Sequence, residues 1–258
     1  MVNLSDPPRV NILGVRVSAT NMTQALGVID RWIAGRTSHY ICVTPIHGIM
    51  ECQNDPALID IFNASGLTVP DGMGVVWLLK LMGHAEVSRV YGPDLMQAVC
   101  AASAEKGWRH FLYGGAPGIA GQLAQELQEQ FPGIQIVGTY TPPFRPLTAE
   151  EDAAVVQQIQ GSGADIVWVG ISTPKQERWM SEHRERLGVP VLVGVGAAFD
   201  FLSGAKPQAP LWIQRSGLEW LFRLASEPRR LWRRYAQYPL FALLLLGQAL
   251  KLRRYPPA

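Results

Sequence analysis

The chain has 258 residues, of which 48% are apolar and 17% charged. It therefore carries enough hydrophobic residues to bury a core and too few charges for an intrinsically disordered protein. Its 23 basic and 21 acidic residues give a net charge of +2, which argues against a uniformly basic nucleic-acid-binding protein.

Short apolar runs alternate with amphipathic segments in the first part of the chain, whose length accommodates one large α/β domain or one domain with an appendage. We expect strands at Val10–Val17, Tyr40–Val43 and Leu67–Pro70. Helices are expected from the Ser18–Asn21 start through Ile33 and over Met73–Met82. This order is typical of repeated β-α units.

The same alternation continues in the second part. Strands are expected at Arg109–Tyr113, Ile134–Thr139, Asp165–Val169 and Val191–Val195. Helices are expected at Ile119–Gln130, Thr148–Gln160 and Pro174–Leu187. Apolar strands that lack polar alternation and are separated by helices indicate a parallel sheet covered on both faces. We therefore predict an α/β fold with a doubly wound, Rossmann-like parallel sheet.

The pattern changes after Gly196, where aromatic residues and arginines replace the β-α alternation. We predict an α/β core over residues 1–204 and a basic, aromatic-rich, helical appendage over 205–258. Residues 221–258 hold eight basic residues and one acidic residue, a balance that favours an anionic partner such as a phosphate or a lipid surface.

The apolar stretch Pro239–Leu250 lies within this appendage. Twelve helical residues rise only about 18 Å, less than the roughly 30 Å hydrocarbon core of a bilayer. The segment is therefore too short to cross a membrane. It either docks in the membrane interface beside basic residues or packs as an ordinary core helix, and both interpretations stay open.

Cysteine usage and the N-terminus indicate the compartment. Cys42, Cys52 and Cys100 show no metal or disulfide spacing, so we expect reduced, buried thiols. The prolines and charges of the first 17 residues do not form a signal peptide. We expect a cytoplasmic protein.

Glycines follow the predicted strand Arg109–Tyr113 in a tight turn that leads into a helix. Small residues at Gly114 and Gly115 let backbone N–H groups and the helix N-terminus approach a phosphate. An ordinary turn that uses glycine for positive φ explains the same residues. Gly114 and Gly115 are candidate diphosphate-binding residues on the first interpretation.

Polar side chains follow two other predicted strands. Asp71 comes directly after Leu67–Pro70, at the sheet edge where α/β proteins bind ligands, although Pro-Asp-Gly is also a common turn. Lys175 and Gln176 begin the helix after Asp165–Val169. Because the carboxyl ends of parallel strands meet at one edge, we expect these side chains to share a site.

Several catalytic patterns are absent from the sequence. It has no GxxxxGK[ST] loop, which excludes a P-loop ATPase, and no GxSxG elbow, which disfavours a serine hydrolase. The five histidines show no HxH or HExxH spacing, and no Asp-x-Asp is present to hold a divalent ion. We therefore expect neither a metal site nor a cofactor.

A series of blocks in the chain resembles the WecG/TagA/CpsF glycosyltransferase family. The resemblance runs over roughly residues 35 to 240. The blocks are Thr44-Pro45, Pro70–Gly74, Arg89 with Gly92 and Asp94, Pro174–Glu177, Gly196–Phe201, and Glu219–Arg223 with Glu227–Arg230. Spaced blocks in a fixed order make this resemblance more specific than any single motif.

The resemblance implies an inverting, metal-independent hexosyltransferase. Such an enzyme moves a sugar from a UDP-sugar donor onto a polyprenyl-diphosphate-linked saccharide during surface or exopolysaccharide biosynthesis. It implies that Asp71 is the catalytic base, and it brings Thr44, Arg89 and Gln176 into the site. It also implies a peripheral position on the inner face of the cell membrane, reached through the appendage.

The tail and one departure from the family complete the expected site. By spacing, the resemblance assigns diphosphate binding to Arg223, Arg230 and Arg233. Many members have Asn where this chain has Ile46, so the next residue, His47, is a candidate for the missing polar role. An inverting transfer also needs one carboxylate to accept the acceptor's proton while cations meet the charge on the leaving diphosphate.

Two other classes of protein share part of this pattern. A Rossmann-type enzyme with a dinucleotide or methyl donor has the same sheet, but a GxGxxG loop is expected there. A non-catalytic, membrane-docked nucleotide-binding module has the same tail without needing Asp71. N-acetylmannosamine, its uronic acid, glucuronic acid and galactose are all candidate sugars, and the sequence identifies neither the acceptor glycan nor the oligomeric state.

Overall fold

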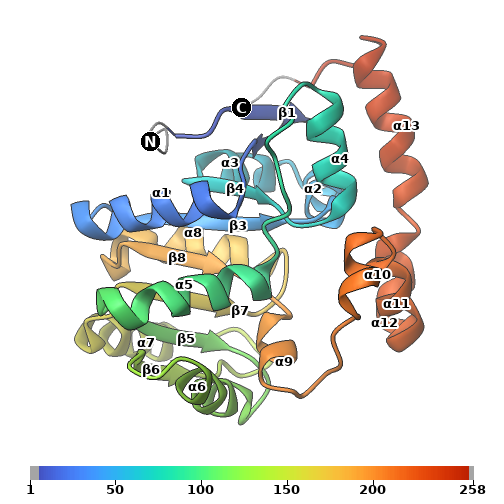
Figure 1. The fold of residues 1–258 in the computed structure, drawn as a ribbon. Coiled ribbons are helices and arrows are strands. Elements are labelled where there is room, and N and C mark those ends of the chain that lie inside the picture. The colour runs from blue at the N-terminus through green and yellow to red at the C-terminus, as the bar shows by residue number, and fades with distance from the viewer. Residues whose placement is uncertain (1–5, 256–258) are drawn as a thin grey trace.

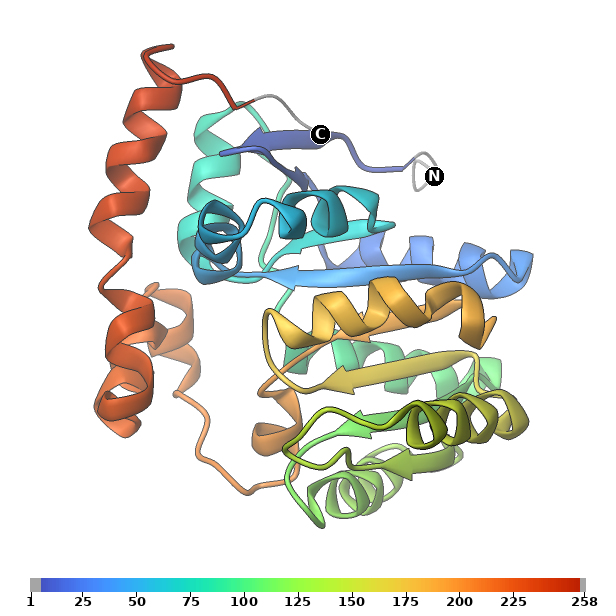
Figure 2. The same ribbon diagram turned by 180° about the vertical axis from the view of Figure 1, so that it is seen from behind.

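Six parallel strands form one sheet in the computed structural model, which describes residues 6–255 (Figures 1 and 2). The strands are β3 (His39–Thr44), β4 (Leu67–Pro70), β5 (Arg109–Gly114), β6 (Gln135–Tyr140), β7 (Ile166–Gly170) and β8 (Val191–Gly194). Their order is β4-β3-β8-β7-β5-β6, and every neighbouring pair is parallel. All six carboxyl ends therefore lie at the same edge of the sheet.

Helices cover both faces of the sheet (Figures 1 and 2). One face packs against α1 (Met22–Gly35), α5 (Gly92–Lys106), α6 (Ile119–Gln130) and α9 (Ala198–Leu202). The other packs against α2 (Ile46–Asn54), α3 (Ala57–Ala64), α4 (Met73–Leu81), α7 (Ala149–Ser162) and α8 (Lys175–Leu187). In β3, Tyr40 and Cys42 enter one core while Ile41 and Val43 enter the other. The predicted doubly wound α/β fold is confirmed.

The N-terminal strand prediction is wrong in one respect. Val10–Val17 is not a single strand but an antiparallel hairpin of β1 (Arg9–Ile12) and β2 (Val15–Ser18). Leu13 and Gly14, at φ 52° and 92°, form the two-residue turn between them. A leucine seldom adopts positive φ, so the sequence carries no ordinary turn signal there.

Other predicted details match the structure. Strand β4 and helix α6 have the predicted bounds. Thr148 begins the predicted helix as its N-cap and forms a capping box with Glu151 at the start of α7. The three cysteines are buried and free. Helix α5 has no counterpart among the elements expected from the sequence.

Four helices follow the core beside the carboxyl edge of the sheet (Figure 2). They are α10 (Leu211–Arg215), α11 (Glu219–Ser226), α12 (Pro228–Tyr235) and α13 (Tyr238–Ala249). We call residues 205–255 the appendage; its boundary after Gly204 stays a prediction. Within residues 6–255, no helix has both the length and the hydropathy needed to cross a membrane.

Helix α13 has one packed side and one exposed side. Phe241, Leu244 and Leu245 belong to or pack against the core that contains α2. The large apolar side chains of α13 that remain exposed are those of Leu240, Leu243 and Leu246. The segment was expected either to pack in the core or to dock in the membrane interface. Core packing accounts for one side of α13, and exposed leucines line its other side.

The end of the appendage is attached to the N-terminal hairpin. The Leu13 N–H donates to Gln248 Oε1 at 2.9 Å, and Gln248 Nε2 donates to the Asn11 carbonyl at 3.0 Å. Asn11 Nδ2 in turn donates to the Tyr255 carbonyl at 2.6 Å. Segments from opposite ends of the chain thus hold each other in place.

Candidate active site

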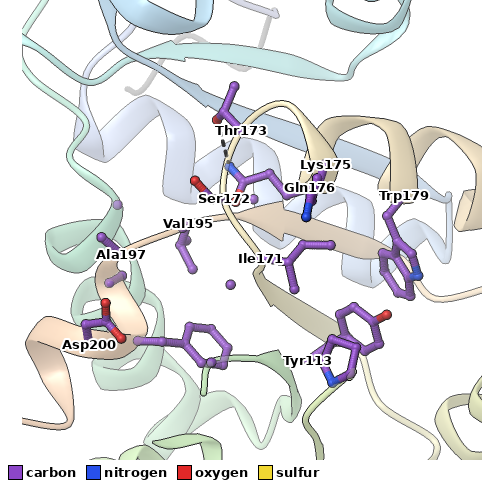
Figure 3. A pocket seen from close by; sticks show the side chains of 18 of the residues that line it. Tyr113, Ile171, Ser172, Thr173, Lys175, Gln176, Trp179, Val195, Ala197 and Asp200 are labelled. Carbon is purple, nitrogen blue, oxygen red and sulfur yellow. Dashed lines mark hydrogen bonds between the residues drawn. The ribbon is translucent and has the colours of Figure 1, made fainter. Parts of the chain in front are cut away.

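The carboxyl ends of the strands open into a cavity of about 1090 Å³, which we call the large cavity. Gln176 and Lys175 line it from the start of α8, together with Tyr113 from β5 and Asp200 from α9 (Figure 3). Ligands of doubly wound proteins bind at this edge of the sheet. The predicted polar residues Asp71, Lys175 and Gln176 do share one cavity.

A second cavity of about 270 Å³, the small cavity, lies between the end of β4 and the appendage. Core residues such as Trp77 and appendage residues such as Trp220 both line it. The two cavities share part of their lining, and we call the shared residues the junction. The junction consists of Pro45, His47, Asp71, Arg223 and Arg234.

Asp71 presents a carboxylate at this junction. The loop that carries it is fixed, because the Asp71 N–H donates to the Thr44 carbonyl at 3.2 Å and Arg89 Nε donates to the Asp71 carbonyl at 2.6 Å. Its Oδ1 is buried without a hydrogen-bond partner among the described residues. Burial raises the pKa of Asp71 to about 6, although the charge of Arg89 opposes the rise. Such a pKa suits a general base near neutral pH.

Arg89 is occupied by contacts within the protein. Besides the Asp71 carbonyl, its guanidinium donates to Gln214 Oε1 at 3.3 Å and to the Glu219 carboxylate. It also lies over the Tyr91 ring, 3.8 Å from the centroid. Its Nη2 is 3.9 Å from Asp71 Oδ1. Arg89 therefore connects the loop of Asp71 to the appendage rather than facing the cavities as a free cation.

His47 is a buried imidazole that lines both cavities. Neither ring nitrogen has a hydrogen-bond partner among residues 6–255, and Nδ1 lies 3.4 Å from Glu51 Oε1. Burial, followed by the charges of Arg234 and Arg223, lowers the pKa of His47 to about 3. The ring is therefore neutral near pH 7, with one nitrogen donor and one nitrogen acceptor to offer a ligand.

The predicted tail arginines divide into two groups. Arg223 lines both cavities and Arg230 lines the large one, where Arg230 is exposed and paired with Glu227. Arg233 is exposed and lines neither cavity. The structure instead brings its neighbour Arg234 to the junction. Neither Arg223 nor Arg234 forms an ion pair with a carboxylate in the described part of the chain.

The periodicity of α12 explains why Arg234 and not Arg233 reaches the site. Leu231 and Tyr235 are the buried residues of this helix. At about 100° per residue, Arg233 lies opposite that buried face, whereas Arg234 lies at its border. Arg234 is not among the site residues expected from the sequence, and the spacing of Leu231 and Tyr235 is the signal that points to it.

Gln176 is held at the cavity wall by neighbouring polar groups. Its Nε2 donates to Glu177 Oε1 at 3.0 Å and to Thr173 Oγ1 at 3.4 Å, while its own Oε1 is buried without a partner among residues 6–255 (Figure 3). Burial raises the pKa of Glu177 to about 7. Glu177 thus positions the side-chain amide of Gln176 by accepting its hydrogen bond, a role not expected from the sequence.

Thr44 lies at the end of β3 but lines neither cavity. It is fully buried, and its hydroxyl donates to the Cys42 carbonyl at 2.9 Å. Its own carbonyl accepts the Asp71 N–H. In this structure Thr44 therefore positions the loop that carries Asp71.

The two glycines after β5 differ in their environments. Gly115 lines the large cavity, whereas Gly114 does not and instead adjoins Gly170 of the paired strand β7. Gly114 has a φ of +138°, and a Cβ there would lie 2.6 Å from the Gly170 carbonyl carbon. Backbone packing thus requires glycine at position 114.

Gly114→Ala is expected to destabilise the fold by roughly 2–4 kcal/mol, because both φ and the β7 backbone oppose a side chain. Gly118→Ala is the matched control: its φ is also positive, at +87°, but nothing lies within 4 Å of an added Cβ. That change is expected to cost about 1 kcal/mol. Thermal unfolding measures both, and equal losses would contradict the close approach of β5 and β7.

Comparisons with known proteins match the chain over nearly its whole length. The sequence model of the Glycosyl transferase WecG/TagA/CpsF family matches residues 10–255. An N-acetylglucosaminyldiphosphoundecaprenol N-acetyl-beta-D-mannosaminyltransferase of Bacillus subtilis (strain 168) is 30% identical over 203 residues, which are 79% of this chain and 77% of that protein. A protein of the same description from Bacillus spizizenii is 32% identical over 196 residues, 76% and 74% of the two chains.

Proposed function

Because the chain belongs to the glycosyl transferase WecG/TagA/CpsF family and is a hexosyltransferase, we propose that it transfers a sugar from a UDP-sugar donor onto a saccharide linked to polyprenyl diphosphate. The two Bacillus relatives are described as transferases that act on N-acetylglucosaminyldiphosphoundecaprenol, which supports this acceptor class. The family favours a transferase over a dinucleotide-dependent enzyme and over a non-catalytic module. The product enters surface or exopolysaccharide biosynthesis.

The position of Asp71 is the observation that carries this proposal. Asp71 lines both cavities, its backbone is fixed by Thr44 and Arg89, and one carboxylate oxygen has no hydrogen-bond partner among the described residues. A base that joins a donor to an acceptor has to lie between the two sites. Asp71 does so, beside two arginines that form no ion pair with a carboxylate of residues 6–255.

The proposed reaction is a single inverting displacement without a metal ion. Asp71 takes the proton of the acceptor hydroxyl while that oxygen attacks the anomeric carbon of the donor. The bond from this carbon to the diphosphate oxygen breaks on the opposite face, and UDP leaves with the electron pair. Arg223 and Arg234 would stabilise the charge that develops on the diphosphate.

The large cavity is the proposed donor site. Its volume of about 1090 Å³ lies just above the usual range for small-molecule sites, roughly 300–1,000 Å³, and accommodates a nucleotide sugar. Lys175, Gln176 and Gly115 line it, and Arg230 borders it from the appendage. We assign these residues to donor binding, with Gly114 and Thr44 supporting the backbone beneath.

We also propose that the appendage holds the enzyme against the inner face of the membrane. The exposed leucines of α13 are followed by Lys251, Arg253 and Arg254. Apolar side chains can enter the interface while each cation near an anionic surface contributes about 1 kcal/mol. The enzyme would then meet its lipid-linked acceptors at the membrane surface that holds them.

The test is a panel of UDP-sugars with polyprenyl-diphosphate-linked N-acetylglucosamine, each with and without a chelator. N-acetylmannosamine is the first sugar to test, given the descriptions of the relatives. Transfer with release of UDP, unchanged by the chelator, is expected, together with thermal protection by UDP but not by NAD. Loss of activity in the chelator would overturn the metal-independent step, and protection by NAD alone would overturn the donor assignment.

A further inference from the structure

The small cavity has a wall of aromatic rings supplied by the appendage. Trp220 of α11 lies 5.7 Å from the Tyr235 ring and 5.8 Å from the Tyr238 ring, and these two tyrosines meet edge to face at 5.4 Å. Trp77 of α4 lines the cavity from the core. Rings from two separate parts of the chain therefore enclose one space.

The remaining lining of this cavity is polar and ordered. Arg89, Gln214 and Glu219 form the hydrogen-bonded group described above, and all three line the cavity. Asp71 and His47 border it at the junction, with polar atoms that have no hydrogen-bond partner in the part of the chain that the structure describes. Aromatic faces combined with a few fixed polar groups are typical of sites that orient a small polar ligand.

We propose that the small cavity binds the terminal sugar of the acceptor, an inference that rests on the proposed function. A sugar ring has apolar C–H faces, which pack on aromatic rings, and hydroxyl groups at its edge, which need fixed polar partners. The cavity volume of about 270 Å³ falls just below the roughly 300 Å³ lower bound of drug-sized sites. It fits one sugar ring and is too small for a nucleotide sugar.

This assignment gives the junction residues separate tasks. The acceptor hydroxyl reaches Asp71 from the small cavity, while the anomeric carbon of the donor approaches from the large cavity. Neutral His47, with both ring nitrogens unpartnered among residues 6–255, would hydrogen-bond a second group of the acceptor sugar.

The assignment also places the acceptor's diphosphate. Arg223 and Arg234, which we assign to the leaving diphosphate of the donor, also border the small cavity. The diphosphate of an acceptor sugar bound there therefore adds a second anion near the same pair of guanidinium groups. The lipid then leaves past the appendage, whose α13 carries the exposed leucines.

The test is to shorten the aromatic wall and to measure donor and acceptor kinetics separately. Trp220→Leu is expected to raise the KM for a short-chain, water-soluble polyprenyl-diphosphate-linked N-acetylglucosamine about tenfold. The KM for the UDP-sugar and the slow release of UDP without acceptor should stay within about twofold. Trp232→Leu is the matched control, since Trp232 is exposed on α12 and lines neither cavity.

A second variant and a second acceptor series make the result decisive. Trp77→Leu changes the same wall from the core, so it should raise the acceptor KM even if Trp220→Leu fails to fold. Both variants should lose the preference for N-acetylglucosamine over glucose in the acceptor but keep the wild-type response to prenyl chain length. A changed response to chain length with unchanged sugar preference would assign the cavity to the lipid and overturn the proposal.

Failure of this inference is distinguishable from failure of the proposed function. If the wild-type protein transfers no sugar to any acceptor, the proposed function itself is wrong. If the wild-type protein transfers sugar while Trp220→Leu and Trp77→Leu keep the wild-type acceptor KM, only the assignment of the small cavity is wrong.

Discussion

Asp71→Asn is expected to lower turnover by about 10²–10⁴-fold, the usual loss when a general base is removed. Asparagine keeps the shape of the side chain and leaves the backbone contacts with Arg89 and Thr44 intact. It cannot accept the proton of the acceptor hydroxyl. Steady-state turnover with saturating donor and acceptor measures the effect.

The matched control for this variant is Asp60→Asn. Asp60 lies 11 positions earlier in the first turn of α3, is exposed, and lines neither cavity. Its replacement should leave turnover within about twofold of wild type. Wild-type turnover in Asp71→Asn would show that the base lies elsewhere, with His47 the next candidate.

The pH dependence should follow from the raised pKa of Asp71. The base acts only when deprotonated, so kcat/KM is expected to rise with pH through about 6.

The stability of the fold should change in the opposite direction. The folded state binds the Asp71 proton more tightly than the unfolded state, in which the pKa of Asp71 is 3.8. The free energy of unfolding therefore falls as the pH rises from 3.8 to about 6. Asp71→Asn removes that loss and should be at least as stable as wild type at pH 7. A lower melting temperature of the variant at pH 7 would contradict this.

Replacing either junction arginine is expected to have the next largest effect. Arg234→Ala and Arg223→Ala should each lower kcat/KM about 10- to 10³-fold, because each removes a charged donor next to the leaving diphosphate. Arg234→Lys keeps the charge and should restore part of the activity. Steady-state kinetics and UDP-dependent thermal protection measure the loss.

Arg233→Ala is the matched control, one residue away and on the side of α12 that lies opposite its buried face. Its guanidinium lies 5.5 Å from the Trp232 ring centroid and outside both cavities. We expect less than a twofold change in kcat/KM. An inactive Arg233→Ala beside an active Arg234→Ala would mean that α12 presents its other face during the reaction.

The core of the fold could be predicted because its signals are local. Unbroken apolar runs between amphipathic segments predict buried parallel strands, and a parallel sheet brings all of its carboxyl ends together. Asp71, Lys175 and Gln176 could be named from this rule alone. The β1–β2 hairpin could not be predicted, because its turn places a leucine at positive φ and has no Asn-Gly pair.

The appendage side of the site was harder to predict because it depends on packing between distant segments. Arg89 contacts Gln214 and Glu219, which lie more than a hundred positions later in the chain. Its role as a connecting residue depends on these distant contacts, so the local sequence does not predict it. Which tail arginine reaches the junction depends on the rotation of α12, which Leu231 and Tyr235 set through burial. Family spacing alone favoured Arg233.

The appendage is attached at both of its ends, near its start by Arg89 and near its end by Gln248. Helices α11 and α12, which carry the junction arginines, lie between these attachments. Their placement accordingly does not depend on contact with a lipid surface. On the proposed membrane docking, the membrane would contribute by confining enzyme and acceptor to the same two-dimensional layer, which raises the effective concentration of the acceptor. Detergent-solubilised enzyme should therefore reach the same maximal rate as membrane-bound enzyme, at a higher bulk concentration of acceptor.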